Sequence, residues 1–98
     1  MTSAQQRERV LQQAWIGDAV LLLYARLKIL REDGRVDAER CSRMTSNQFL
    51  GGLGEPSEME AEIGKAFEKQ GLEAAFKWID QHLMPLFTRQ EAKRQRRG

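Results

Sequence analysis

The chain has 98 residues, which is enough for one domain with a modest hydrophobic core. Its fractions of hydrophobic residues (41%) and charged residues (31%) are ordinary for a soluble globular protein. Its one cysteine, Cys41, excludes an internal disulfide and a metal site made of several thiolates, and it fits a reducing, intracellular setting.

The formal net charge of +2 is unevenly distributed along the chain. Residues 88–98 hold five basic side chains against the single acid Glu91, so this end carries +4 and the rest of the chain −2. The most apolar run, residues 15–30, is interrupted by charged side chains and is too short to span a bilayer. Polar residues precede it, which is not the pattern of a signal peptide. We therefore expect a cytoplasmic protein without a membrane partner.

Composition and periodicity predict a chain made of helices. Leu, Ala, Glu, Gln, Lys and Arg dominate, and no stretch has the alternation of a strand. Ser3 and Gln6 have the form of a capping box for the first helix, and Gly34 is typical of its end. The predicted helices cover residues 4–31, about 38–45, about 47–53, about 56–69 and about 72–84.

The last predicted helix ends before Pro85, whose ring cannot continue the hydrogen-bond ladder. Beyond Thr88 the chain is polar and basic and has no apolar periodicity, so we expect it to be mobile. The predicted organisation is an all-α domain of about five helices over residues 1–87, followed by a basic tail over residues 88–98.

Asp18 lies in the middle of the most apolar run. Helical spacing places it on one stripe with the apolar side chains Leu11, Ala14, Leu22, Ala25 and Ile29. A carboxylate on such a stripe faces the core or a cleft, where it needs a cation, a hydrogen-bond network or a metal ion. A second acid, Glu60, lies beside an apolar row on a later helix, with Gly64 one turn further on. Because Gly17 is next to Asp18, the two helices can cross closely, and the two carboxylates can then share one Mg²⁺ ion.

Structural interpretations of the two acids compete with the metal site. Ser57 and Glu60 also have the form of a capping box, in which Glu60 accepts hydrogen bonds from backbone amides at the start of its helix. Asp18 can instead be a buried acid paired with an arginine such as Arg43, and spacing alone favours these structural interpretations. For the basic tail, phosphate binding and simple solvation are about equally supported. Packing or surface roles are the simpler interpretation for four further residues: His82, Cys41, Trp15 and Tyr24.

Three segments of the chain follow the order of motifs that are found together in one known family. They are Trp-Ile-Gly-Asp-Ala-Val-Leu at residues 15–21, Arg-Met-Thr-Ser-Asn-Gln-Phe-Leu at 43–50 and Glu-Ala-Glu-Ile-Gly-Lys-Ala-Phe at 60–67. The first resembles the signature helix of the ribonuclease III family, the second its middle helix pair, and the third its second acidic motif. Two of the family's four acids are absent, since Ala14 and Ser57 stand in their places. In this respect, and in lacking a separate double-stranded-RNA-binding domain, the chain is most similar to the mini-ribonuclease III branch.

The resemblance implies the helical bundle of a ribonuclease III endonuclease domain, and a homodimer through the signature helix with Trp15, Ile16 and Ala19 at the contact. It implies that Asp18 and Glu60 are the catalytic residues and the ligands of Mg²⁺, or of Mn²⁺ in its place. The implied reaction is hydrolysis of double-stranded or structured RNA, such as ribosomal RNA precursors, to products with 5′-phosphate and 3′-hydroxyl ends. For RNA binding we expect contributions from six residues: Asn47, Arg43, Lys93, Arg94, Arg96 and Arg97.

A non-catalytic alternative is also open, namely an RNA-binding or scaffold dimer that keeps the fold after the loss of two acids. The segment before the second acidic motif, residues 54–59, is shorter than in members of the family, which use additional residues there to grip RNA. A helical dimerisation module with no role in RNA binding is a third and simpler hypothesis.

Overall fold

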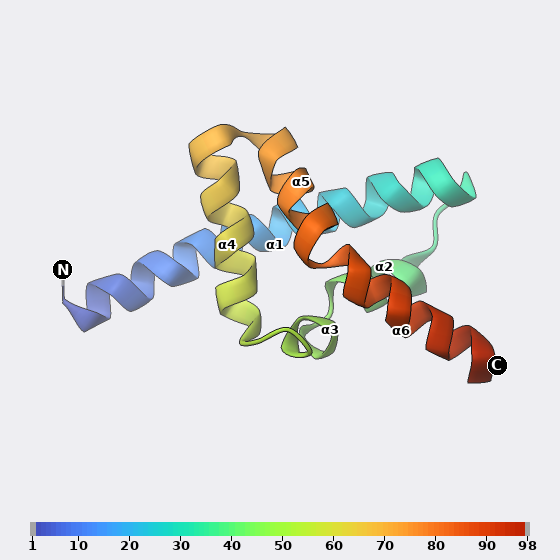
Figure 1. Cartoon of the computed structure of the whole chain (residues 1–98). Coiled ribbons are helices and arrows are strands. Elements are labelled where there is room, and N and C mark those ends of the chain that lie inside the picture. The colour runs from blue at the N-terminus through green and yellow to red at the C-terminus, as the bar shows by residue number, and fades with distance from the viewer. Residues whose placement is uncertain (1, 98) are drawn as a thin grey trace.

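Six α-helices make up the structure, and the longest of them runs the length of the molecule (Figure 1). The structure is a computed structural model that describes residues 2–97, and within that range it contains no strand. The helices are α1 (Ser3–Asp33), α2 (Ala38–Thr45), α3 (Asn47–Gly51), α4 (Pro56–Gln70), α5 (Leu72–His82) and α6 (Met84–Arg97). The predicted all-α class is confirmed, and the first five helices lie within a few residues of their predicted positions.

The ends of α1 are set by side-chain and backbone capping. Thr2 rather than Ser3 begins the helix: its hydroxyl accepts a hydrogen bond of 3.2 Å from the N–H of Gln5, whose side chain accepts one of 2.9 Å from the N–H of Thr2. The predicted capping box therefore exists, one residue earlier than expected. At the other end Gly34 has a φ of 70° and donates to the carbonyl of Leu30. Glycine is favoured there because it adopts this left-handed conformation without a steric penalty.

Residues 88–97, which the sequence predicted to form a mobile basic tail, form the second half of helix α6. Pro85 lies in the first turn of this helix, where its missing N–H costs nothing, and the chain bends at Leu83 between α5 and α6. Arg43 of α2 donates two hydrogen bonds of 3.1 Å to the carboxylate of Glu91. This long-range ion pair stabilises a segment that is rich in good helix formers but lacks apolar periodicity.

Helix α4 crosses α1 near the middle of α1 (Figure 1), and two glycines allow the backbones to touch. A Cβ atom at Gly17 would lie 1.7 Å from the carbonyl oxygen of Glu60, and one at Gly64 would lie 2.0 Å from the carbonyl oxygen of Gln13. No residue with a side chain fits at either position without a shift of the backbone. The close crossing that these small residues predicted is confirmed.

One hydrophobic core lies between α1 and the other helices. Its largest fully buried side chains are Leu21, Met44, Leu50, Ile63, Ile79 and Leu83. The buried Tyr24 joins α1 to α5, because its hydroxyl donates to Asp80 and its ring meets that of Phe76 edge-on at 5.3 Å. Phe49 and Phe87 make a second edge-on pair at 5.6 Å that joins α3 to α6.

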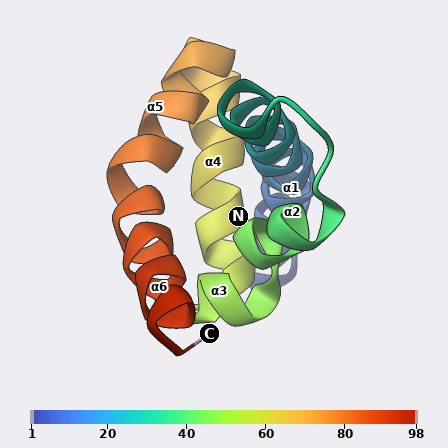
Figure 2. The same ribbon diagram turned by 90° about the vertical axis from the view of Figure 1, so that its right-hand side faces the viewer.

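The face of α1 that is turned away from this core carries large apolar side chains. They are Leu11, Trp15, Ile16, Leu23, Leu27 and Leu30, and the side chain of Trp15 is 79% exposed. Figure 2, which looks nearly along α1, shows α4, α5 and α6 on one side of this helix. Despite this apolar face, none of the helices within residues 2–97 combines the length and hydropathy needed to cross a membrane.

Substitution of Gly17 tests the helix crossing. We expect Gly17→Ala to lower the free energy of unfolding by about 2 kcal/mol, because the new methyl group would overlap the carbonyl of Glu60. Gly51→Ala is the matched control: Gly51 is helical and a methyl group there would project into open space, so this change should cost nothing. Urea unfolding followed by circular dichroism measures both, and equal midpoints for the two variants would contradict the close contact.

Candidate functional site

The crossing of α1 and α4 brings together the two acids that the sequence singled out. Asp18 follows Gly17 on α1, and Glu60 is the residue whose carbonyl faces Gly17 from α4. The backbone of Glu60 lies against Gly17, the neighbour of Asp18, and the charge of Asp18 acts on the carboxyl group of Glu60, so the two acids lie close together. Asp18 is exposed and Glu60 is half-buried. The pair therefore lies at the rim of the α1–α4 contact, open to solvent on the side of Asp18.

The sequence predicted that Asp18 faces the core or a cleft, and the structure places it in an exposed position. Ala14 and Ala25 of the predicted stripe are buried, but Asp18 is exposed and Leu11 is 51% exposed. The stripe therefore marks the edge of the buried face of α1. The buried face is centred on side chains such as Leu21 and is displaced around the helix from the predicted stripe.

Neither structural alternative for the two acids is found. Arg43 pairs with Glu91 and not with Asp18. Helix α4 is capped by Glu55, whose carboxylate accepts a hydrogen bond of 2.9 Å from the N–H of Glu58. The carboxyl group of Glu60 is thus left to interact with Asp18.

Electrostatics make the Asp18–Glu60 pair sensitive to protons and cations. Burial raises the pKa of Glu60 most, and the hydrogen bond with Asp18 and the negative charges of Asp18 and Glu55 add to it, so that the pKa rises from 4.5 to about 7. Two carboxylates in contact repel each other when both are ionised. A shared proton or a bound cation relieves this repulsion.

The residues present fit a magnesium ion better than a structural zinc ion. Within residues 2–97 no cluster of three or more His, Cys, Asp or Glu side chains converges on one point. A closed zinc site needs about four such ligands. Mg²⁺ at phosphate-processing sites is commonly held by one or two carboxylates, and water and phosphate oxygens complete its shell. Asp18 and Glu60 supply that number of hard oxygen ligands, which also suit Mn²⁺.

The residues predicted to bind RNA are spread over α2, α3 and α6. Arg43, Lys93 and Arg94 line one cavity of about 800 Å³ between these helices. Asn47 is exposed at the start of α3, and the Nε of Arg96 donates to the carbonyl of Ala92 at 3.5 Å. The side chain of Arg97 lies outside the described residues. The predicted RNA-binding residues therefore lie on other helices than Asp18 and Glu60, which belong to α1 and α4.

Glu55 is a contributor to the site that the sequence did not suggest. It caps α4, and its charge also raises the pKa of Glu60. The sequence signal for this capping role is that Glu55 directly precedes Pro56, because proline is common at the first position of a helix.

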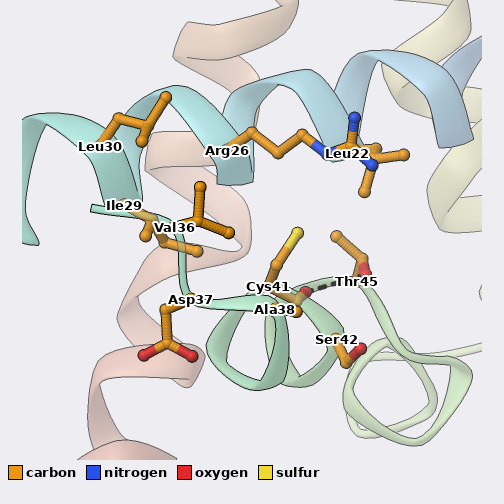
Figure 3. A pocket seen from close by; sticks show the side chains of 10 residues that line it. All are labelled: Leu22, Arg26, Ile29, Leu30, Val36, Asp37, Ala38, Cys41, Ser42 and Thr45. Atoms are coloured by element: carbon orange, nitrogen blue, oxygen red, sulfur yellow. Dashed lines mark hydrogen bonds between the residues drawn. The ribbon is translucent and has the colours of Figure 1, made fainter. Parts of the chain in front are cut away.

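A second concave region lies between α1 and α2 (Figure 3), and its nearest lining residue, Leu22, is one helical turn from Asp18. This cavity of about 430 Å³ is lined mainly by apolar side chains, with the charged Arg26 and Asp37 among them. The thiol of Cys41 points towards α1 in Figure 3, and the residue packs against the core, in line with its predicted role as a small hydrophobic residue. The cavity adjoins the exposed apolar face of α1.

Comparison of the chain with protein-family models, with curated proteins and with solved structures finds no match. The geometry itself defines an all-α domain with a pair of carboxyl groups at a close helix crossing.

The raised pKa of Glu60 predicts how stability depends on pH. The folded protein holds this proton more tightly than the unfolded chain, so the free energy of unfolding should fall as the pH rises from 4.5 to about 7 and level off above that. Glu60→Gln should remove this fall, which we expect to be on the order of 1 kcal/mol because the pair is partly open to solvent. Urea unfolding at pH 5 and pH 8 measures it. The exposed Glu68 on the same helix provides the control, since Glu68→Gln should keep the wild-type dependence. Parallel profiles for wild type and Glu60→Gln would contradict the raised pKa of Glu60.

Proposed function

We propose that this chain is a Mg²⁺-dependent endoribonuclease of the ribonuclease III type that cleaves double-stranded or structured RNA, such as ribosomal RNA precursors. The close approach of Asp18 and Glu60 at the α1–α4 crossing, where the backbone of Glu60 lies against Gly17, carries this proposal. These are the two acids that the resemblance assigns to the metal site, and they lie far apart in the sequence. Their proximity in the fold supports a shared metal site, which their spacing in the sequence alone could not support.

The geometry suits the binding of one divalent cation. Gly17 and Gly64 hold the two backbones in contact, which limits how far the carboxylates can move relative to each other. Glu60 must lose its proton to bind a cation, so binding should strengthen as the pH rises towards and above 7. When bound there, Mg²⁺ would supply activation of water and stabilisation of the charge that develops on a phosphate. Asp18, on the solvent side, would face the phosphodiester.

The exposed apolar face of α1 supports the homodimer. Its large side chains surround Trp15, and Ile16 and Ala19 are also exposed there. A contiguous apolar surface of this kind is typical of a protein interface. Because Asp18 lies one turn from Trp15 on the same helix, a two-fold dimer through this face would place the acid pairs of both copies near one another. A shared site of this kind suits the two strands of an RNA duplex, which is recognised by its shape and phosphates.

A non-catalytic RNA-binding or scaffold dimer is the second candidate. The number of acids favours it, because only two carboxyl groups meet at the crossing and no third ligand converges on them within the described part of the chain. Ala14 and Ser57 are the positions at which the resemblance would place two further acids.

Cleavage of long double-stranded RNA in the presence of Mg²⁺ tests the enzyme. We expect wild type to cut the RNA and Asp18→Asn and Glu60→Gln each to lose at least about 100-fold in rate, because each removes half of the cation ligands. Glu68→Gln, an exposed change on α4, should keep the wild-type rate.

Folding of these variants is a built-in control, since removing one of two mutually repelling carboxylates should not lower stability at pH 8. RNA binding by wild type without Mg²⁺-dependent products would exclude the enzyme and leave the scaffold. Products that persist in both acid variants would assign the cleavage to another site.

Sedimentation tests the dimer. Wild type should sediment as a dimer and Trp15→Glu as a folded monomer, because the new charge would be buried in the interface. Leu72→Glu on α5 is the matched control: Leu72 is a partly exposed apolar residue away from this face, and the variant should stay dimeric. A monomeric wild type at the concentration used for cleavage would contradict the shared site.

A further inference from the structure

Helix α6 presents a stripe of basic side chains to solvent. Arg89, Lys93 and Arg96 are exposed, and their spacing of four and three residues places them on one side of the helix. Met84 and Phe87 occupy the opposite, buried side. Within residues 2–96 none of the three basic side chains forms an ion pair with an acid. The stripe therefore carries uncompensated positive charge.

The one acid at this end of the chain is withdrawn from that stripe. Glu91 points towards α2, where Arg43 binds its two carboxylate oxygens through two hydrogen bonds of 3.1 Å. Both side chains are mostly shielded from solvent, and the bond to Glu91 raises the pKa of Arg43. Bidentate pairs of this kind fix orientation as well as distance. The pair neutralises Glu91 and holds α6 against α2.

We propose that α6 is a docking helix for the phosphate backbone of an RNA duplex, and that Arg43 positions this helix and does not itself bind the RNA. The choice of RNA as the polyanion rests on the proposed function. Residues four apart on a helix are separated by about 6 Å along its axis, so the stripe can meet several phosphates of one strand. Contacts of this kind confer affinity without sequence preference and weaken as salt rises.

The first arm of the test measures binding of the full chain to an RNA duplex without Mg²⁺, by fluorescence anisotropy over a range of salt concentrations. We expect the double variant Lys93→Gln/Arg96→Gln to bind about tenfold more weakly and to reduce the salt slope by about 2. The double variant Arg7→Gln/Arg9→Gln is the matched control, because it removes the same charge from exposed positions at the other end of the molecule. It should bind almost as wild type does. Equal losses in the two double variants would overturn the proposal.

The second arm separates positioning from charge. Glu91→Ala makes the chain more positive, so general attraction alone predicts tighter binding, whereas loss of the pair with Arg43 predicts binding about fivefold weaker. Arg43→Lys keeps the charge and should weaken binding by a similar factor. Because Arg43 acts through Glu91, adding Arg43→Lys to Glu91→Ala should cause no further loss. Tighter binding by Glu91→Ala, or additive losses in the double variant, would overturn the positioning role.

Failure of this inference and failure of the proposed function give different results. If wild type binds RNA through α6 but yields no Mg²⁺-dependent products, the docking helix stands and the endoribonuclease does not. If wild type cleaves RNA and the α6 variants bind it as tightly as wild type, the enzyme stands and the docking helix is excluded. Circular dichroism of each variant checks that α6 changes leave the rest of the fold intact.

Discussion

The structure depends on the contact between the backbones of α1 and α4 at Gly17 and Gly64. At these two positions a single methyl group would overlap a carbonyl oxygen of the facing helix. Interiors are packed too densely to absorb such a change without movement of a whole helix. The contact closes the core on one side and places Asp18 against Glu60 at its rim. The fold and the candidate site therefore share one steric requirement.

When both carboxyl groups are ionised, the Asp18–Glu60 pair lowers the stability of the fold. Glu60 is half-buried beside a second carboxyl group, which raises its pKa to about 7. An arrangement that stability alone would not favour is typical of binding and catalytic sites, where a cation or substrate supplies the missing interaction. Structural ion pairs elsewhere in the chain join opposite charges, as Arg43 and Glu91 do.

Charge and apolar surface are separated in the molecule, which supports a division of roles in the proposed function. The acid pair lies at the α1–α4 crossing, the basic stripe lies on α6, and the exposed apolar side chains lie on α1. In the proposed enzyme the acid pair would hold the cation and the basic stripe would bind the RNA backbone. The apolar side chains of α1 would contact another copy of the chain. Because the acids and the basic stripe lie on different helices, variants of one leave the other intact.

Local sequence determined the helices and their ends, because caps and breaks such as Asp37, Gly34 and Pro56 act over a few residues. It also predicted the close crossing, since small residues next to two acids leave room for a backbone. Tertiary structure decided how residues 88–97 are placed, because the bond from Arg43 to Glu91 joins α2 to α6 across distant parts of the chain. Tertiary structure likewise decided that Asp18 is exposed while Glu60 is half-buried. Helical periodicity predicts which residues share a stripe, but the packing of the neighbouring helices decides where the buried face ends.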